Sequence, residues 1–347
     1  MRVGVDARHL GAGRGVAVYL EGMLGALRDV ELSLLVPGRG PLAPAARALA
    51  DRPGVRVVRT RLGSRAVFGA AALTGMPAMT ELLGDAVDVV WLPAPAPVAV
   101  GAAPYVLTVH DLSFARRPQD FTPYERLWHR LARPAGLARR AAHVVTDTAA
   151  VRDEVRAAWG VERVTVVAPG VRRPPEGVAP AAGAYVLFVG ALEPRKDPVA
   201  VARAAAAAGV PAWFAGTGRL AGDVAAAGGR LLGRAEDAAL AALLAGALAL
   251  VLPSRLEGFG FPPLEAALCG TPSIVSDLPV LRETLGDGGA LFVAPGDDAA
   301  LAGAIRRLRA DDALRAALAA RARARAEQLT WERAARALRA VLEEAAR

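Results

Sequence analysis

The chain has 347 residues, more than one hydrophobic core usually covers, so we expect two domains. Hydrophobic residues make up 54% of the sequence and exclude general disorder, while the single cysteine, Cys269, excludes an intramolecular disulfide; we expect this thiol in the core. The net charge of +8 would suit nucleic acid or anionic lipid, but no nucleic-acid-binding motif is present and only 5% of residues are aromatic, so we expect no nucleic-acid partner.

The N-terminus runs directly into a predicted strand, without the charged start and apolar run of a secretion signal. The longest uncharged apolar stretch, residues 238–252, is too short to span a bilayer and divides at Gly246 into a helix and a strand. We therefore expect a cytoplasmic protein, with at most peripheral contact at the inner face of the cell membrane.

Short β-rich runs alternate with helical runs through the first half, which is typical of a parallel, doubly wound sheet. The predicted strands cover residues 3–6, 32–36, 55–59, 87–92, 105–109, 143–146 and 164–167. The clearest helices between them are predicted over residues 16–27, 122–140 and 149–159. We expect residues 1–168 to form one domain of Rossmann-like fold.

The first predicted turn, GAGRG at residues 11–15, follows a strand and opens a helix, as a phosphate-binding loop would. It lacks the complete dinucleotide motif, and the second strand has no acidic residue for a ribose. Because loops at the carboxyl ends of parallel strands line ligand sites, we expect Gly13 and Gly15 to face a ligand, with a plain tight turn as the alternative.

His110 and Asp111 come directly after the predicted strand 105–109, in a position that faces a ligand site. We therefore predict a functional role for His110. The other three histidines are interpreted as structural: His9, His129 and His143.

The predicted helix 122–140 carries five arginines and a tryptophan. Such a face is either a solvated surface or a docking surface for anionic lipid headgroups.

Residues 169–183 are rich in proline and glycine and are the predicted linker. After it the alternation resumes, and residues 184–329 are predicted to form a second Rossmann-like domain, with a ligand cleft between the two. The predicted elements cover residues 185–189, 198–208, 212–214, 230–232, 238–245, 248–252, 273–276, 279–285 and 290–293, followed by two long helices. The last helix, 330–347, is predicted to pack back on the first domain.

The stretch PSRLEGFGFPPLEAALCG, residues 253–270, carries the strongest signal for chemistry. A buried strand precedes it, and two prolines are tolerated only at the start of a helix, which puts Glu257 in a loop and Glu265 in the first helical turn. The N–H groups of Gly258, Gly260 and the helix start would bind a diphosphate, and the carboxylates would bind hydroxyls. As the alternative, Glu265 only caps the helix and Glu257 lies in an ordinary turn.

Of the 42 basic residues, 41 are arginine and one is lysine, Lys196. It lies in GALEPRKD, directly after the predicted strand 185–189. A lone lysine there indicates a site for a compact point charge rather than a planar guanidinium.

These segments resemble the retaining family 4 glycosyltransferases of the GT-B fold. The similar segments are the glycine-rich first turn, TVHDLSF at 108–114, VLFVGALEPRKD at 186–197 and LPSRLEGFGFPPLEAALCGTPSIVSDLPVLRE at 252–283, which holds the family's E-x7-E as Glu257 and Glu265. The HDLSF and GALEPRKD forms resemble the branch that contains O-antigen and capsule mannosyltransferases. One departure is Ala191, where many members have arginine, so that Arg195 and Lys196 form the basic pair.

The resemblance implies retaining transfer of a hexose, mannose being favoured, from a GDP- or UDP-linked sugar to a saccharide or lipid-linked acceptor in cell-surface polysaccharide assembly. It also implies that residues 184–329 bind the nucleotide sugar and that residues 1–168 form the acceptor side. No D-x-D motif is present, and basic side chains can neutralise the leaving diphosphate, so we expect no metal and no other cofactor. A nucleotide-sugar epimerase of the same fold is the alternative function. A two-lobed solute-binding protein would require a secretion signal.

The resemblance also implies a role for each candidate residue. Glu265 would bind the ribose, Glu257 the donor sugar, and His110 the sugar and phosphate from the other wall, while Gly233 and Arg234 would lie beside the base. The predicted catalytic residues are His110, Glu257, Arg195 and Lys196. The predicted substrate-binding residues are Gly13, Gly15, Asp111, Gly190, Gly233, Arg234, Gly258, Phe259, Gly260 and Glu265.

Overall fold

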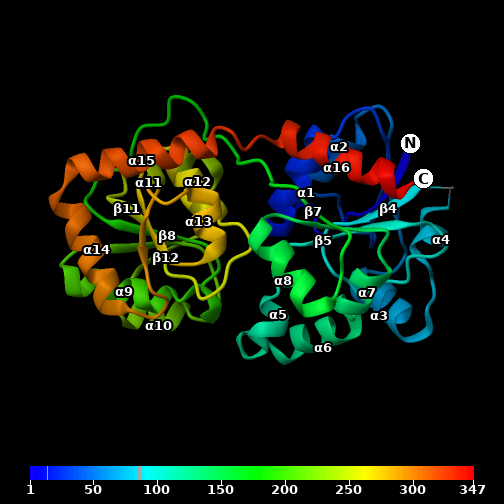
Figure 1. Cartoon of the computed structure of the whole chain (residues 1–347), viewed down its shortest axis with the longest axis horizontal. Helices are drawn as coiled ribbons and strands as arrows, with labels where there is room; N and C mark the ends of the chain where they lie inside the picture. Colours follow the sequence, from blue (N-terminus) through cyan, green and yellow to red (C-terminus); the bar gives the residue numbers. More distant parts are fainter. Residues whose placement is uncertain (14, 85–86) are drawn as a thin grey trace. The chain divides into compact units, whose positions relative to one another are not determined.

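The computed structural model describes residues 1–13, 15–84 and 87–347, so Arg14 of the glycine-rich turn lies outside the described residues. The chain forms two compact units. Unit 1 comprises residues 1–170 and 330–347, and unit 2 comprises residues 171–329 (Figure 1). Both are parallel sheets covered by helices, which confirms the predicted fold class of two Rossmann-like units.

Unit 1 contains a seven-stranded parallel sheet with the order β3-β2-β1-β4-β5-β6-β7. Its strands are β1 (Arg2–Asp6), β2 (Glu31–Val36), β3 (Val55–Arg59), β4 (Val89–Leu92), β5 (Tyr105–Val109), β6 (His143–Thr146) and β7 (Val164–Val166). Every residue of β4, β5 and β6 is buried, as expected for central strands covered on both faces. The strand order reverses between β1 and β4, where open sheets of this kind bind ligands.

The helices of unit 1 are α1 (Gly15–Ala26), α2 (Pro44–Ala50), α3 (Ser64–Thr74), α4 (Met79–Leu83), α5 (Ser113–Arg116), α6 (Pro123–Ala132), α7 (Pro134–Arg140), α8 (Ala149–Trp159) and α16 (Trp331–Ala345), with a 3-10 turn at Pro118–Asp120. The sequence pattern does not predict α2 to α5. Three of these four have seven residues or fewer, too short for a helical period to be visible.

The single helix predicted over residues 122–140 is wrong, because the structure has two. Helix α6 begins at a cap in which Thr122 Oγ1 accepts from the Glu125 N–H and the Glu125 carboxylate accepts from the Thr122 N–H. It ends at Arg133, which adopts the left-handed conformation with φ of 46°. Pro134 has no N–H and disfavours a right-handed helical conformation in the residue before it, so α7 starts anew.

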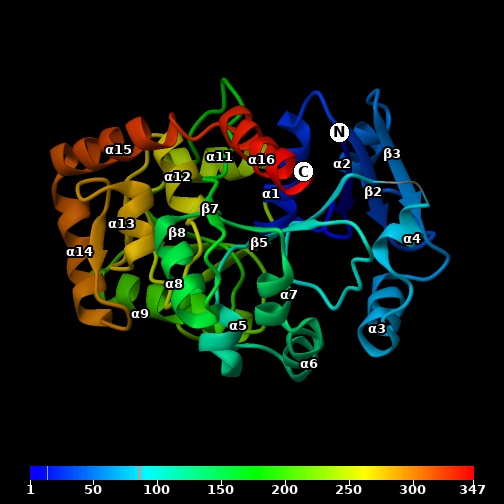
Figure 2. The same ribbon diagram turned by 45° about the vertical axis from the view of Figure 1, so that its right-hand side comes forward.

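Helix α16 packs against α1 in unit 1 (Figures 1 and 2). Its buried residues Ala334, Leu338 and Leu342 join the core formed by the central strands. The indole of Trp331 lies on Gly22, where a Cβ atom would come within 2.3 Å of the ring. Only glycine therefore lets α16 approach α1 this closely.

Unit 2 contains a six-stranded parallel sheet with the order β10-β9-β8-β11-β12-β13. Its strands are β8 (Val186–Val189), β9 (Ala212–Ala215), β10 (Arg230–Gly233), β11 (Ala249–Leu252), β12 (Ser273–Ser276) and β13 (Leu291–Val293). Its helices are α9 (Pro198–Ala208), α10 (Ala221–Ala226), α11 (Asp237–Gly246), α12 (Phe261–Leu268), α13 (Pro279–Leu285), α14 (Asp298–Ala310) and α15 (Asp312–Ala326), with a 3-10 turn at Pro194–Lys196. The strand order reverses between β8 and β11.

The segment after Gly170 packs on unit 2 rather than running free. The Ala181 N–H donates to the carbonyl of Ala242 at 2.9 Å, and Arg172 forms an ion pair with Asp237 at 2.6 Å. Within the described ranges, no helix is long and apolar enough to cross a membrane.

Candidate active site

In unit 2, the loops after β8 and β11 bring the only lysine to the first glutamate of the E-x7-E pattern. Lys196 Nζ donates to Glu257 Oε1, and Ser254 Oγ donates to the same oxygen at 2.5 Å. The Lys196 and Glu257 side chains are only 13% and 6% exposed. These residues are 61 positions apart in sequence but adjacent in space, because β8 and β11 are neighbours with parallel carboxyl ends.

The two loops are also joined through their backbones and by a second ion pair. The Arg255 N–H donates to the carbonyl of Arg195 at 2.8 Å, and the Arg255 guanidinium pairs with Asp197 at 2.7 Å. The Arg195 guanidinium has no hydrogen bond or ion pair within the described part of the chain. Of the predicted basic pair, Lys196 is thus paired with the Glu257 carboxylate, whereas Arg195 has no such pair within the described residues.

The backbone at this sheet edge is shaped by glycines. Gly190 has φ of 145°, and a Cβ atom on Gly216 would come within 1.8 Å of the Gly190 carbonyl oxygen. Gly260, with φ of 92°, is the residue that precedes α12. Gly233, with φ of 69°, ends β10 next to the exposed Arg234.

Two details of the loop before α12 bear on the predicted anion site. The Phe259 side chain is 4% exposed and belongs to the core of unit 2. Pro262 and Pro263 occupy the second and third positions of α12 and have no N–H. Of the first three residues of α12, only Phe261 therefore has a backbone N–H.

Glu265 lies one position beyond the first turn of α12. The helix starts at Phe261, which makes Glu265 its fifth residue, and the structure shows no side-chain cap. The predicted first-turn position is therefore wrong by one residue, and the capping alternative is not supported. Burial raises the pKa of the Glu265 carboxyl to about 7, while Arg172, with Nη2 at 3.8 Å, lowers it and Asp237 raises it further.

Glu265 also lines a cavity of about 30 Å³, together with Arg172, Asp237 and Cys269. Cys269 is half-buried there and packs against the hydrophobic core of unit 2, so its predicted place in the core is confirmed in part. Burial, together with the nearby Glu265, raises the pKa of this thiol to about 11.

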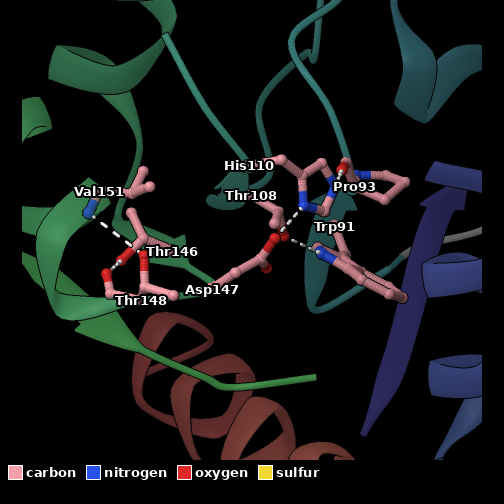
Figure 3. Close-up of polar contacts among 8 residues, drawn as sticks. All are labelled: Trp91, Pro93, Thr108, His110, Thr146, Asp147, Thr148 and Val151. Carbon is pink, nitrogen blue, oxygen red and sulfur yellow. Dashed lines mark hydrogen bonds and ion pairs between the residues drawn. The ribbon is translucent and has the colours of Figure 1, made fainter. Parts of the chain in front are cut away.

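In unit 1, His110 is held at both ring nitrogens (Figure 3). Nδ1 lies 2.7 Å from Oδ2 of Asp147, and Nε2 lies 2.9 Å from the carbonyl oxygen of Pro93. Burial alone would lower the pKa of the imidazole, but the Asp147 carboxylate outweighs it and the pKa is raised. Asp147 was missed by the sequence reasoning, although pairing of β5 with β6 puts Val109 opposite Thr146 and makes the next residues neighbours.

The remaining predicted residues of unit 1 have local roles in the fold. Asp111 Oδ1 accepts from the N–H of Ser113 at 2.8 Å and from its hydroxyl at 2.6 Å, which fixes the turn into α5. Gly13 has φ of 59°, and Gly15 opens α1. Across residues 1–13, 15–84 and 87–347, no three side chains of His, Cys, Asp or Glu are grouped so that they could hold a metal ion.

Two family models match the chain over consecutive segments. "Glycosyltransferase Family 4" matches residues 13–173, and "Glycosyl transferases group 1" matches residues 174–325. The O-antigen chain mannosyltransferase B of Escherichia coli is 42% identical over 103 residues, which are 30% of this chain and 27% of that protein. The chain thus aligns with about a quarter of this relative's length.

Solved structures resemble the whole chain. Sucrose-phosphate synthase from Thermosynechococcus elongatus aligns with a TM-score of 0.76 and 20% identity over 99% of this chain and 98% of that one. Anabaena HepE in complex with UDP and glucose aligns with a TM-score of 0.71 and 19% identity over 99% of both chains. At these identities the similarity establishes the fold.

Proposed function

Because the chain belongs to glycosyltransferase family 4 and has the GT-B fold, we propose that it transfers mannose from a nucleotide-diphosphate sugar to a glycan or lipid-linked acceptor in cell-surface polysaccharide assembly, with retention of anomeric configuration. The observation that carries this proposal is the Lys196–Glu257 pair beside Arg195 at the edge of the unit 2 sheet. The mannosyltransferase relative supports the choice of sugar, and the HepE complex with UDP supports a nucleotide-linked donor. The matched families give no support to the alternative of an epimerase.

The residues of unit 2 supply charge where the reaction needs it. As the bond to the sugar breaks, negative charge grows on the diphosphate, and Arg195 and Lys196 stabilise it through charge-assisted hydrogen bonds. Glu257 accepts hydrogen bonds from sugar hydroxyls, and Glu265 accepts them from the ribose. In this proposal His110 of unit 1 contacts the donor sugar and phosphate, and no metal ion takes part.

The acceptor is proposed to lie at a membrane, which unit 1 meets through the surface of α3 and α6. The Phe68 and Trp128 rings join these helices, with centroids 6.4 Å apart. Large apolar side chains are exposed there, among them Leu73 at 78%, Tyr124 at 47% and Leu127 at 50%. Residues 1–168 carry 21 basic and 15 acidic residues, a balance of +6, whereas 169–347 carry 21 and 19, a balance of +2. Positive charge beside exposed apolar side chains fits an anionic lipid surface.

A panel of nucleotide sugars tests the proposed reaction. We expect the protein to release nucleoside diphosphate from one of GDP-mannose, UDP-glucose or related donors, equally in EDTA and in Mg²⁺, and NMR of the product to show the donor's anomeric configuration. Lys196→Ala should lose activity by about 10- to 100-fold in either condition, the range for a charged hydrogen bond. Arg203→Ala, which removes a surface ion pair of α9 with Asp298, is the matched control.

Each outcome bears on a separate part of this proposal. Turnover of no donor would reject glycosyl transfer. Activity only with Mg²⁺ would reject the metal-free reaction, and an inverted product would reject retention. If added Mg²⁺ restores the activity that Lys196→Ala loses, the lysine and a metal ion can both neutralise the leaving diphosphate.

A further inference from the structure

The interactions of His110 fix where its protons lie. The Pro93 carbonyl oxygen, 2.9 Å from Nε2, can only accept a hydrogen bond, so Nε2 carries a proton. An ionised Asp147, 2.7 Å from Nδ1, can also only accept, so Nδ1 carries a second proton. The ring is then an imidazolium paired with a carboxylate.

Asp147 lies beside the start of a helix. It is 2% exposed and directly precedes Thr148, whose hydroxyl accepts from the Val151 N–H at 3.3 Å and caps α8 (Figure 3). The partial positive charge at the start of the helix stabilises an anion there, whereas burial raises the pKa of Asp147. Within the described residues Asp147 Oδ1 has no hydrogen-bond partner, so the charge of this carboxylate is balanced by its contact with His110.

The ring is also fixed in orientation. The Tyr19 and His110 rings pack edge to face, with their centroids 4.6 Å apart, and Tyr19 is completely buried. Behind Tyr19, the buried Trp91 donates from Nε1 to the Thr108 hydroxyl at 3.0 Å. With both nitrogens bonded and one edge packed against a buried ring, rotation of the imidazole would break two hydrogen bonds.

The titratable groups that face the ring come from three elements. They are Asp147 from the turn between β6 and α8, Asp111 from the turn after β5, and Tyr19 from α1. Burial lowers the pKa of His110, but both carboxylates raise it and prevail. Burial raises the pKa of Asp147, His110 lowers it and Asp111 raises it, and the net direction is upward. The hydrogen bonds at both ring nitrogens of His110, rather than the burial of the two groups, therefore support a shared ion pair.

We propose that Asp147 is a positioning residue that keeps His110 doubly protonated and fixed in orientation, so that His110 acts on the donor as a cation and hydrogen-bond donor and not as a base. Its part in the reaction rests on the function proposed above. An oxygen of the donor that takes the place of the Pro93 carbonyl would receive the Nε2–H. The ring side chain is 19% exposed, which leaves an edge for that contact.

Nitrogen-15 NMR of histidine-labelled protein tests the charge of His110 without reference to catalysis. The chain has four histidines, and the His110→Asn variant assigns the relevant signal. In the parent protein we expect both ring nitrogens of His110 to stay protonated at pH values above the ordinary pKa of a histidine. In Asp147→Asn, titration should shift to lower pH, and in Asp147→Glu it should stay closer to that of the parent. A neutral His110 at pH 7 in the parent would overturn the proposal even if the variants fail to fold.

Kinetics with the donor that the parent turns over tests the role in the reaction. In Asp147→Asn we expect kcat to fall by about 10- to 100-fold with little change in KM, the range for a hydrogen bond to a charged group. The fall in activity at high pH should also move to lower pH, because the imidazolium loses its proton more readily. Asp153→Asn removes an exposed carboxylate of α8 and serves as the control.

The two measurements separate the possible failures. An altered titration with unchanged kcat and pH profile would overturn the positioning role, as would an unchanged titration. If the parent turns over no nucleotide sugar, the proposed function fails, while the NMR titration still decides whether Asp147 sets the charge of His110.

Discussion

Glu265 combines burial with a predicted task that needs its charge. Its pKa of about 7, raised by burial, means that the folded protein binds a proton more tightly than the unfolded chain does. Such a group contributes stability below its unfolded pKa of 4.5, and this contribution is lost as the pH rises through 7. Between pH 4.5 and 7 the free energy of unfolding should therefore fall by about 3 kcal/mol.

The substitution Glu265→Gln should therefore have opposite effects on stability and on binding. Above pH 7 the variant should be more stable than the parent, by up to about 3 kcal/mol, and should lack the parent's loss of stability between pH 4.5 and 7. Its affinity for the donor should fall by about 1.5–3 kcal/mol, because an amide accepts ribose hydroxyls less strongly than a carboxylate. Thermal unfolding and calorimetry at several pH values measure the two effects.

The exposed Glu327→Gln, which removes a surface pair with Arg323, is the control and should change neither quantity appreciably. In the parent, donor affinity should also weaken as the pH falls below 7. Equal donor affinity in the parent and in Glu265→Gln would remove Glu265 from the predicted binding residues.

At the scale of elements, the break between α6 and α7 depends on a strained residue. Arg133 has φ of 46° and ψ of 57°, a conformation that costs a residue with a Cβ about 1–2 kcal/mol. Arg133→Gly should raise stability by about 0.5–1 kcal/mol, since glycine removes this cost but adds unfolded-state entropy. Arg130→Gly, inside α6, should instead lower stability by about 1 kcal/mol. Denaturant unfolding of both variants measures the contrast, and a destabilised Arg133→Gly would contradict it.

The surface of α3 and α6 gives a second prediction at this scale. The protein should sediment with vesicles of anionic lipid and not with neutral ones, and salt should weaken the binding by screening. Leu127→Glu should reduce sedimentation, whereas Leu231→Glu, at a residue 40% exposed on β10 of unit 2, should not. Equal binding to both lipids, or none at low salt, would make this an ordinary solvated surface.

The sequence predicts the bounds of several strands and helices. The strands β3, β5, β6 and β12 have the predicted bounds, because turn residues limit their apolar runs. The helices α8 and α9 also have the predicted bounds, since Thr148 or Pro198 marks the start and a glycine follows the end. Helix α3 was missed because one of its eleven residues, Gly69, weakens the helical pattern. The continuous helix over residues 122–140 was wrong because the restriction that Pro134 places on Arg133 was not weighed.

For the candidate site, sequence motifs predicted residues but not their partners. The E-x7-E and GALEPRKD segments mark Glu257 and Lys196, yet their mutual contact depends on β8 and β11 being neighbours across 61 residues. Asp147 has no motif of its own, and only the register of β6 against β5 places it beside His110. Phe259 stays a predicted substrate-binding residue, and the structure adds that its ring is buried in the core of unit 2, where it stabilises the fold.

At the scale of the whole molecule, unit 2 is one continuous segment, whereas unit 1 needs both ends of the chain. Residues 171–329 have their own core and should fold when expressed alone. Residues 1–170 alone would expose the apolar surface that Leu338 and Leu342 of α16 cover, and we expect them to aggregate. Circular dichroism and melting curves of the two fragments measure this. A stable 1–170 fragment would show that α16 is dispensable.

Joining residues 1–170 directly to 330–347 should restore a folded unit 1, because Gly170 already lies against Trp331. A Cβ atom on Gly170 would come within 2.3 Å of the Trp331 backbone nitrogen, so the two ends need only a short connection. An unfolded product from this fusion, with a folded 1–170 fragment, would contradict the assignment of α16 to unit 1.

The chain passes between the units twice, and the residues at the two crossings contact each other in unit 1 and in unit 2. In unit 2 the Val171 N–H donates to the Leu329 carbonyl at 3.0 Å, and in unit 1 Gly170 meets Trp331. Unit 2 is thus inserted in unit 1 as one continuous segment whose two ends lie close together. Recombination at the two chain crossings could replace all of unit 2 in one step without interrupting either hydrophobic core. Under the proposed function, such an exchange would change the donor sugar while keeping the acceptor.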